Sequence, residues 1–225
     1  MLFAIACTQN GTVGDQKPTD FERRINEAVF PGLQGGPHEN TIAAIAVALR
    51  EAASPNFRAY QKQVLSNMQH LCTTLNSLGY EIVTGGSETH VCLLDLRPNK
   101  LDGSRVERVL ELVGICDKCF PEPVLVTRSK TDESRSSLSP SGIRLGTAAL
   151  TSRGLLEADI TKVAGFIHQA VLLTLRVNEL AGSKLIKDFH AVLNDNQEIK
   201  AALSAMKNEV EAFAAGFPMP GFPNF

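Results

Sequence analysis

The glycine pair Gly35-Gly36 is the first segment whose residue types could do chemistry. It stands between Gln34 and Pro37, and a helical pattern rich in alanine follows it closely. Consecutive glycines let backbone N–H groups approach an anion, and the N-terminus of a following helix adds N–H groups that have no partner inside the helix. The same residues also suit a plain tight turn. From its residues alone, this segment is therefore either a phosphate cradle or a structural turn.

Arg144 is the second residue that could bind an anion. It stands between Ile143 and Leu145, in a short segment typical of a β-strand. An unpaired charge between apolar neighbours on a strand costs free energy, so we expect this arginine to need an anionic partner. A structural salt bridge and a bound substrate carboxylate would both meet that need.

The cysteines do not form a recognisable metal site or redox motif. Cys116 and Cys119 make a single C-x-x-C pair, with no second pair and no histidine close by in the sequence. That is too little for a four-ligand zinc site, and a thioredoxin-like strand–helix context is missing. Cys7, Cys72 and Cys92 fall among apolar residues and are predicted to fill the core. We therefore predict no metal site.

Composition and charge are those of an ordinary globular protein. The 225 residues are 44% hydrophobic and 20% charged, which disfavours disorder, and the net charge of −2 lacks the basic excess of a general nucleic-acid binder. The longest apolar runs reach about half of the roughly 20 residues that cross a bilayer. We therefore expect neither nucleic-acid nor membrane partners. Five cysteines, an odd and small number for this length, predict a reducing compartment.

Periodicity and capping residues predict the elements that must position these segments. We expect strands over 1–7, 80–84, 91–96 and 143–147, and helices over 21–29, 39–53, 55–78, 103–113, 155–180, 184–193 and 197–213. The alanine-rich helix over 39–53 is expected to pack closely inside a core. Segment 117–141 carries prolines, serines and mixed charges, and is predicted to be a long irregular excursion at the surface.

Two longer motifs around the candidate anion ligands resemble serine hydroxymethyltransferase. The first, 30–40, reads Phe-Pro-Gly-Leu-Gln-Gly-Gly-Pro-His-Glu-Asn, and the second, 139–154, reads Ser-Pro-Ser-Gly-Ile-Arg-Leu-Gly-Thr-Ala-Ala-Leu-Thr-Ser-Arg-Gly. Tyr60-Gln61, segment 79–86, His90 and the Phe-Pro-x-Pro-Gly-Phe ending also match. The resemblance covers nearly all of this chain, but only about the C-terminal half of the family's length.

The resemblance implies an α/β protein of fold type I, the aspartate-aminotransferase-like architecture of pyridoxal-phosphate transferases, here truncated. Residues 1–54 would be the C-terminal piece of the large cofactor-binding domain. Residues 55–225 would form the small α+β C-terminal domain, with three antiparallel strands covered by helices.

The resemblance also implies an activity, a cofactor and partners. The family interconverts serine and glycine with tetrahydrofolate as co-substrate and pyridoxal 5′-phosphate as cofactor. The small-molecule partners would be serine, glycine and folate, and the protein would be a homodimer or homotetramer. We expect a cytoplasmic location, and a mitochondrial one stays open because a targeting peptide would precede Met1.

Several residues receive roles from the resemblance. Arg144 would hold the substrate carboxylate, and Gly35 and Gly36 would contact the cofactor phosphate of the neighbouring subunit. His38 and His90 would support the site from behind. The lysine that forms the family's Schiff base would lie before Met1, so this chain would carry no catalytic residue and would be inactive alone.

Two further consequences follow from where this chain departs from the family. In place of the family's Asn-Lys-Asn segment, whose last Asn touches the folate pterin, this chain has Asp117-Lys118-Cys119, and the following loop is longer. The folate contact is therefore not preserved. The alternative to an enzyme is a non-catalytic fragment, or a pairing partner of a full-length subunit.

Overall fold

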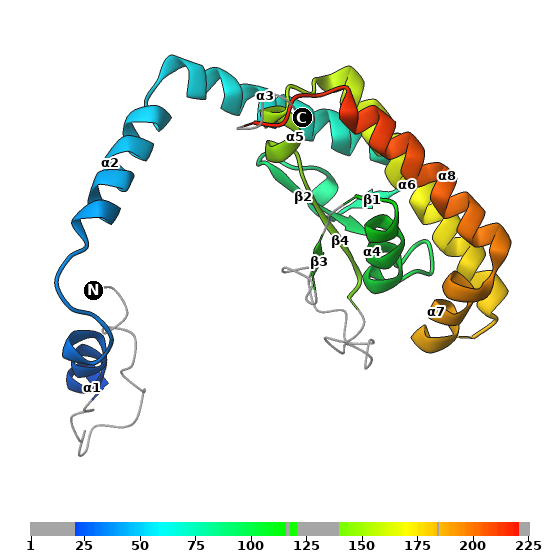
Figure 1. Ribbon diagram of the computed structural model, residues 1–225, viewed down its shortest axis with the longest axis horizontal. Coiled ribbons are helices and arrows are strands. Elements are labelled where there is room, and N and C mark those ends of the chain that lie inside the picture. Colours follow the sequence, from blue (N-terminus) through cyan, green and yellow to red (C-terminus); the bar gives the residue numbers. More distant parts are fainter. Residues whose placement is uncertain (1–20, 116–117, 121–139, 184, 221–225) are drawn as a thin grey trace, which may run out of the picture. The chain divides into compact units, whose positions relative to one another are not determined.

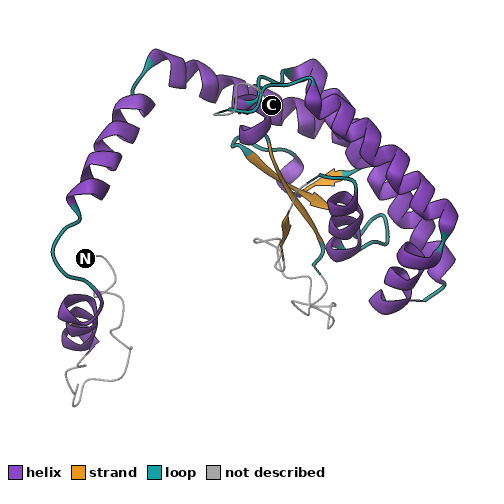
Figure 2. Cartoon of the chain, viewed as in Figure 1, coloured by secondary structure: helices purple, strands orange, loops and turns teal. Residues whose placement is uncertain are grey.

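The computed structural model describes residues 21–115, 118–120, 140–183 and 185–220, with the side chains of 118–120 excepted. The chain divides into two compact units, Met1–Ser54 and Pro55–Phe225. Their elements are labelled in Figure 1 and coloured by type in Figure 2. The predicted strand over 1–7 and most of the segment 117–141 lie outside the described residues.

The described part of the first unit contains two helices and an irregular connection. Helix α1 (Phe21–Glu27) runs into a helical turn (Ala28–Leu33) that breaks at Phe30, where the backbone is extended, and α2 (Glu39–Ala52) follows. No described residue of α2 is buried in this chain. Within the described part of its own unit, α2 therefore does not pack inside a core as expected.

A four-stranded antiparallel sheet forms the base of the second unit. Its order is β1 (Glu81–Ile82), β2 (Val91–Asp95), β4 (Gly142–Gly146) and β3 (Lys118–Phe120). The prediction of three strands is wrong, because β3 pairs with β4 inside a segment that was predicted to be irregular. β1 is also shorter than predicted. The chain leaves the strand at Val83 and turns through Thr84, whose φ of 69° is left-handed.

In the described residues of this unit the sheet is accompanied by the α-helices α3 (Pro55–Ser77), α4 (Gly103–Leu112), α5 (Ala148–Ser152), α6 (Glu157–Ala181), α7 (Ile186–Asp195) and α8 (Gln197–Ala215). Their ends follow local signals. α3 ends before Gly79, whose φ of +87° allows the left-handed turn that stops a helix. The side chain of Asn196 caps α8 by accepting hydrogen bonds from the N–H groups of Glu198 and Ile199. The short helix α5 was not predicted.

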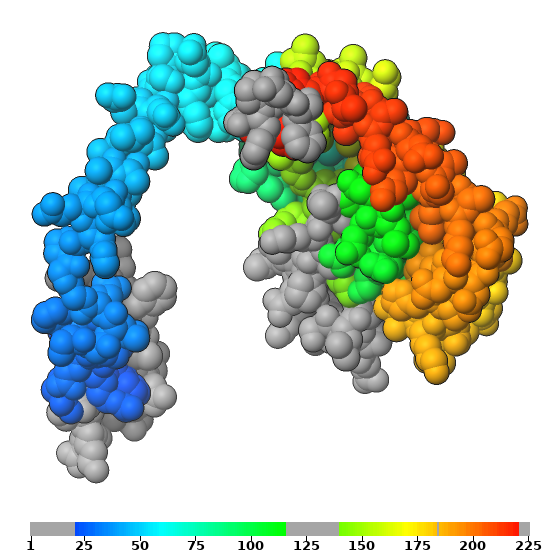
Figure 3. Space-filling view, in the orientation of Figure 1, coloured from blue at the N-terminus to red at the C-terminus, as the bar shows by residue number. Residues whose placement is uncertain are grey.

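The core of the second unit lies between one face of the sheet and the helices. α6 packs against α3, α4, α7 and α8, and in the space-filling view α7 and α8 form a continuous surface on this side (orange to red, Figure 3). By length and composition alone α6 could cross a membrane, which corrects the expectation that no segment is long enough. Its buried residues, including Ile160, Ile167 and Val177, pack in the core. Such packing is that of the central helix of a globular unit.

Candidate functional site

Arg144 lies on β4, on the sheet face opposite the core. It pairs with Leu93 of β2 on one side and with Lys118 of β3 on the other. Its neighbours Ile143 and Leu145 are buried, whereas the Arg144 side chain is exposed, because successive side chains of a strand point to opposite faces. Because the Arg144 side chain is exposed, the free-energy cost on which we based the expectation of an anionic partner does not arise.

The guanidinium of Arg144 remains available to an anion. Among the described residues, the structure records no salt bridge and no hydrogen bond that engages this group. Its position in the sheet depends on Gly142, two residues earlier. A β-carbon at Gly142 would collide with the carbonyl of Leu94, so a side chain there would push β4 away from β2. Glycine thus allows the pairing that sets Arg144 opposite Leu93.

The end of β4 is anchored by Thr147. Its hydroxyl donates to the carbonyl of Val64 on α3 at 2.9 Å, and its backbone N–H donates to the carbonyl of His90 at 3.3 Å. Thr147 is fully buried. These two contacts hold the strand that carries Arg144 against α3 and against the residue before β2. His90 takes part in this anchorage through its backbone carbonyl, and its side chain is exposed.

A polar seam continues this anchorage from α3 to α5 and the start of α6. The Tyr60 hydroxyl donates to the Ala148 carbonyl at 3.0 Å, and Asn67 Nδ2 donates to the Leu155 carbonyl at 2.9 Å. The Ser66 hydroxyl donates to Glu157 at 2.5 Å, which lowers the pKa of that carboxyl. Sequence reasoning missed Asn67, although its polar side chain on an otherwise apolar face of α3 was a signal.

Gly35 and Gly36 lie in the open loop that enters α2. Neither adopts a left-handed φ, and apart from its sequence neighbours a β-carbon at either position would meet no atom of the described residues within 4 Å. His38 occupies the N-cap position of α2 without a side-chain hydrogen bond to the helix. The glycine backbone and the first N–H groups of α2 are therefore accessible to an anion, which is the chemistry that a phosphate group requires.

The predicted site residues fall into two sets. Gly35, Gly36 and His38 belong to the first unit, whereas His90 and Arg144 belong to the second. Among the described residues, no group of three or more histidine, cysteine, aspartate and glutamate side chains is arranged to hold a metal ion.

Comparison with known proteins identifies the family. The model of the serine hydroxymethyltransferase family matches residues 2–167, which include both the glycine loop and the strand of Arg144. The chain belongs to the serine hydroxymethyltransferase family. Membership implies the fold type I architecture of pyridoxal-phosphate transferases, of which the helices and small sheet described above are part.

Individual relatives extend this similarity along the chain. A cytosolic serine hydroxymethyltransferase of Oryctolagus cuniculus is 48% identical over 92% of this chain and 41% of its own length. The chloroplastic serine hydroxymethyltransferase 3 of Arabidopsis thaliana is 41% identical over 90% of this chain and 37% of its own length. A putative mitochondrial serine hydroxymethyltransferase of Neurospora crassa is 41% identical over 92% of this chain and 39% of its own length. The chain thus spans about two fifths of the length of these relatives.

Proposed function

We propose that this chain is part of a serine hydroxymethyltransferase that interconverts serine and glycine with tetrahydrofolate and pyridoxal 5′-phosphate. The observation that supports it best is Arg144. Its guanidinium is exposed on a strand fixed between two others, with no anionic partner among the described residues. A guanidinium held in this way offers parallel N–H groups that match both oxygens of an amino-acid carboxylate.

Arg144 would bind and orient the carboxylate of serine or glycine. The rigidity of the strand matters because a substrate that is already held in the right orientation loses less translational and rotational entropy on reaching the transition state, which lowers the barrier. Gly142, Thr147 and the seam from α3 would keep the strand in register while the guanidinium engages the substrate. Pyridoxal phosphate, when bound, supplies the electron sink for the reaction.

Gly35 and Gly36 would approach the phosphate of the cofactor in a neighbouring subunit. The open space around both glycines supports this role, since backbone N–H groups can be reached without a side chain in the way. The site would then be completed by two copies, as a homodimer or homotetramer. His38 and His90 would support the residues that make these contacts. The isolated chain would lack the lysine that binds the cofactor covalently.

Two further parts of the proposal concern the folate contact and the location of the protein. Asp117-Lys118-Cys119 replaces the Asn-Lys-Asn segment that the family places at the pterin, so tetrahydrofolate would be held mainly by the rest of the enzyme. The names of the relatives include cytosolic, mitochondrial and chloroplastic proteins. We propose a cytoplasmic location, in keeping with the cysteine content.

Complementation tests the proposed function. The chain would be co-expressed with an N-terminal portion of the rabbit cytosolic relative that supplies the rest of the family's length. We expect the pair to retain pyridoxal phosphate and to form glycine from serine in the presence of tetrahydrofolate, while each part alone forms none. A pair that assembles and binds the cofactor but cannot turn over serine would contradict the proposal.

Gly36→Val is the matched test of the phosphate contact. A β-branched side chain there should block backbone approach, so the complemented enzyme should lose pyridoxal phosphate more readily on dilution. The control is Gly165→Val, at a glycine on α6 that also has open space around its β-carbon position. Equal cofactor retention in both variants would show that Gly35-Gly36 is a structural turn and does not contact the phosphate.

The second candidate function is a non-catalytic partner of a full-length subunit. It is favoured by α2, where Ile42, Ile45 and Leu49 form an apolar stripe at helical spacing and are 53%, 54% and 65% exposed. A surface of this kind requires a covering partner. Co-purification with the full-length rabbit relative, without any gain of serine turnover, would favour this candidate over the first.

A further inference from the structure

An apolar pocket lies between the helices of the second unit and the core side of β4. It has a volume of about 350 Å³, and its lining comes from α3, β4, α5, α6 and α8, from Gly114 and Ile115, and from Phe217 after α8. That volume is at the small end of the roughly 300–1,000 Å³ that is usual for small-molecule sites. Leu145 lines the pocket, whereas Arg144 points to the opposite face of the sheet. The pocket therefore offers space for a ligand on the face that Arg144 does not occupy.

Aromatic rings form one wall of this pocket. The ring of Phe213 on α8 meets that of Phe166 on α6 with 5.6 Å between centroids and that of Phe217 with 5.1 Å, both edge to face. These three residues are partly buried, whereas Leu71 and Leu155, which also line the pocket, are almost fully buried in the core. The apolar wall thus reaches from the core to the solvent. The hydrocarbon part of a ligand would gain free energy by leaving water for this space.

Arg153 is the charged residue of the lining, all of which lies in the described part of the chain. Its Nη2 donates to the carbonyls of Ala214 at 2.6 Å and Phe217 at 3.0 Å, and its Nε donates to the carbonyl of Pro218 at 3.2 Å. These bonds hold the guanidinium against the end of α8. Among the described residues, the two N–H groups of Nη1 have no partner and no carboxylate forms a salt bridge with Arg153. The carbonyls therefore orient a cation whose charge they do not neutralise.

We propose that this pocket binds a small amphipathic carboxylate, a molecule with an apolar chain or ring and one carboxylate group. The apolar part fills the space between the aromatic wall and the core, and the carboxylate accepts hydrogen bonds from Nη1 of Arg153. Lys162 adds a second positive charge beside the same wall, with its Nζ 5.6 Å from the centre of the Phe213 ring. The proposal does not depend on the proposed function, because none of these residues has a part in binding the substrate or the cofactor.

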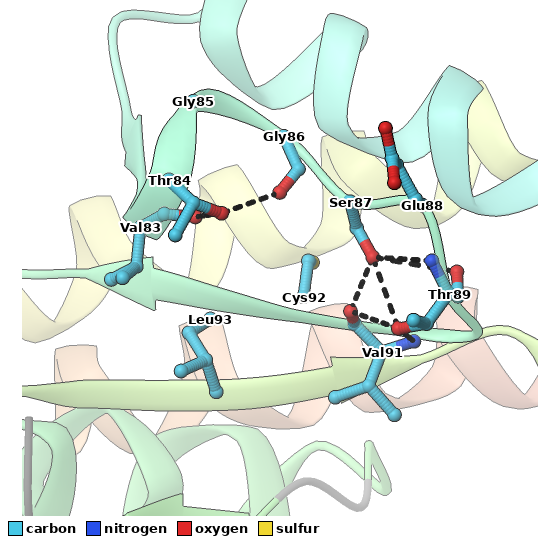
Figure 4. Close-up of a pocket in the computed structure, with 10 residues that line it drawn as sticks. All are labelled: Val83, Thr84, Gly85, Gly86, Ser87, Glu88, Thr89, Val91, Cys92 and Leu93. Carbon is cyan, nitrogen blue, oxygen red and sulfur yellow. Dashed lines mark hydrogen bonds between the residues drawn. The ribbon is translucent and has the colours of Figure 1, made fainter. Parts of the chain in front are cut away.

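A larger pocket of the second unit lacks this combination of features. It has a volume of about 660 Å³ and is lined by the loop between β1 and β2 and by the start of β2, and its charged lining residue is the acidic Glu88 (Figure 4). The Ser87 hydroxyl donates to the carbonyl of Val91 at 2.6 Å and accepts from the N–H of Thr89 at 3.1 Å. These polar groups already bond to one another. A carboxylate in that pocket would meet a like charge and no cation, so it would not bind there.

Calorimetric titration of the full chain with octanoate, octanol and acetate separates the two parts of the ligand. We expect octanoate to bind at one site per chain, and acetate, which lacks the apolar part, to show no binding. Octanol should bind at least about tenfold more weakly than octanoate because it has no carboxylate for Arg153. From butanoate to octanoate, each added CH₂ should tighten binding roughly fourfold. Affinity that does not change with chain length would overturn the proposal, and so would octanol that binds as tightly as octanoate.

Two tryptophan substitutions locate the site. Ala149 of α5 lines the pocket and is exposed, so it borders the mouth. In Ala149→Trp the indole should block entry and weaken octanoate binding at least about tenfold. The control is Ala205→Trp, at an exposed alanine of α8 that does not line the pocket, and it should leave the affinity unchanged. Equal affinities of the two variants would show that octanoate binds elsewhere, which contradicts the proposal.

Two substitutions of Arg153 test the charge. Arg153→Gln keeps an amide donor for the carbonyls at the end of α8 but removes the charge, so octanoate should bind at least about tenfold more weakly while octanol binds as before. Arg153→Lys keeps the charge and should keep the preference for octanoate. If Arg153→Gln retained that preference, the proposed carboxylate contact would be wrong. The titrations of the unaltered chain and of Ala149→Trp decide the question even if Arg153→Gln fails to fold.

Discussion

Asn67 of α3 donates a hydrogen bond from Nδ2 to Oγ1 of Thr151 on α5 at 2.8 Å, across 84 positions of sequence. The same amide also bonds to the carbonyl of Leu155, and its oxygen accepts from Gln63 at 3.0 Å. Asn67 and Thr151 are both buried, where polar side-chain atoms are nearly always hydrogen-bonded. This contact ties α5, which follows the Arg144 strand, to α3.

Asn67→Ala should destabilise the second unit without altering its secondary structure. The substitution leaves the Thr151 hydroxyl and the Leu155 carbonyl without this donor in a buried place, which costs about 1–3 kcal/mol. For a unit of this size, each kcal/mol corresponds to a fall in melting temperature of roughly 2–4 °C. Gln69→Ala, at an exposed position on the same helix, should change stability by less than about 0.5 kcal/mol. Equal effects of the two substitutions in thermal melts would show that the seam contributes nothing specific.

Arg144→Lys separates a substrate contact from a structural one. Because the Arg144 side chain is exposed, the melting temperature of the chain should hardly change. In the complemented enzyme, the loss of one charge-assisted hydrogen bond, worth about 1.5–3 kcal/mol, should weaken glycine binding roughly 10- to 150-fold, with pyridoxal phosphate retained. Calorimetric titration with glycine and a thermal melt measure the two quantities. A variant that melts early yet binds glycine normally would remove Arg144 from the substrate site.

Tyr80 should make the stability of the second unit sensitive to alkaline pH. Burial raises its pKa from the ordinary value of 10.0 to about 12, and its hydroxyl is hydrogen-bonded to Nδ1 of His168 at 2.8 Å. A raised pKa means that the folded state favours the neutral phenol. The stabilisation is therefore fully present below pH 10 and is lost as the pH rises to about 12.

The two tyrosines of this chain allow a direct measurement. In Tyr60→Phe the remaining phenol is Tyr80, and its ionisation can be followed by ultraviolet absorbance, with an expected midpoint near pH 12. Tyr80→Phe is the matched variant, and it should lose the decline in stability between pH 10 and about 12. A midpoint near pH 10 in protein that is still folded would show that burial does not control this hydroxyl.

The sequence by itself determined the longer helices of the second unit, though not α5, and it indicated the family. Pro55 and Gly79 bound α3, and Asn196 begins α8, because capping and helix-stopping residues act through their own backbone and their near neighbours. The motifs around Gly36 and Arg144 indicated the family that the comparison then identified.

Only the tertiary structure decided which faces are covered and which distant residues meet. Strand β3 exists because it pairs with β4, and nothing within its three residues required that partner. The exposure of Arg144 depends on the register of β4 against β2. The uncovered stripe of α2 shows the same limit, because periodicity reports which face of a helix is apolar and not what covers it. Burial is set by partners from elsewhere, and local sequence carries no signal for where those partners lie.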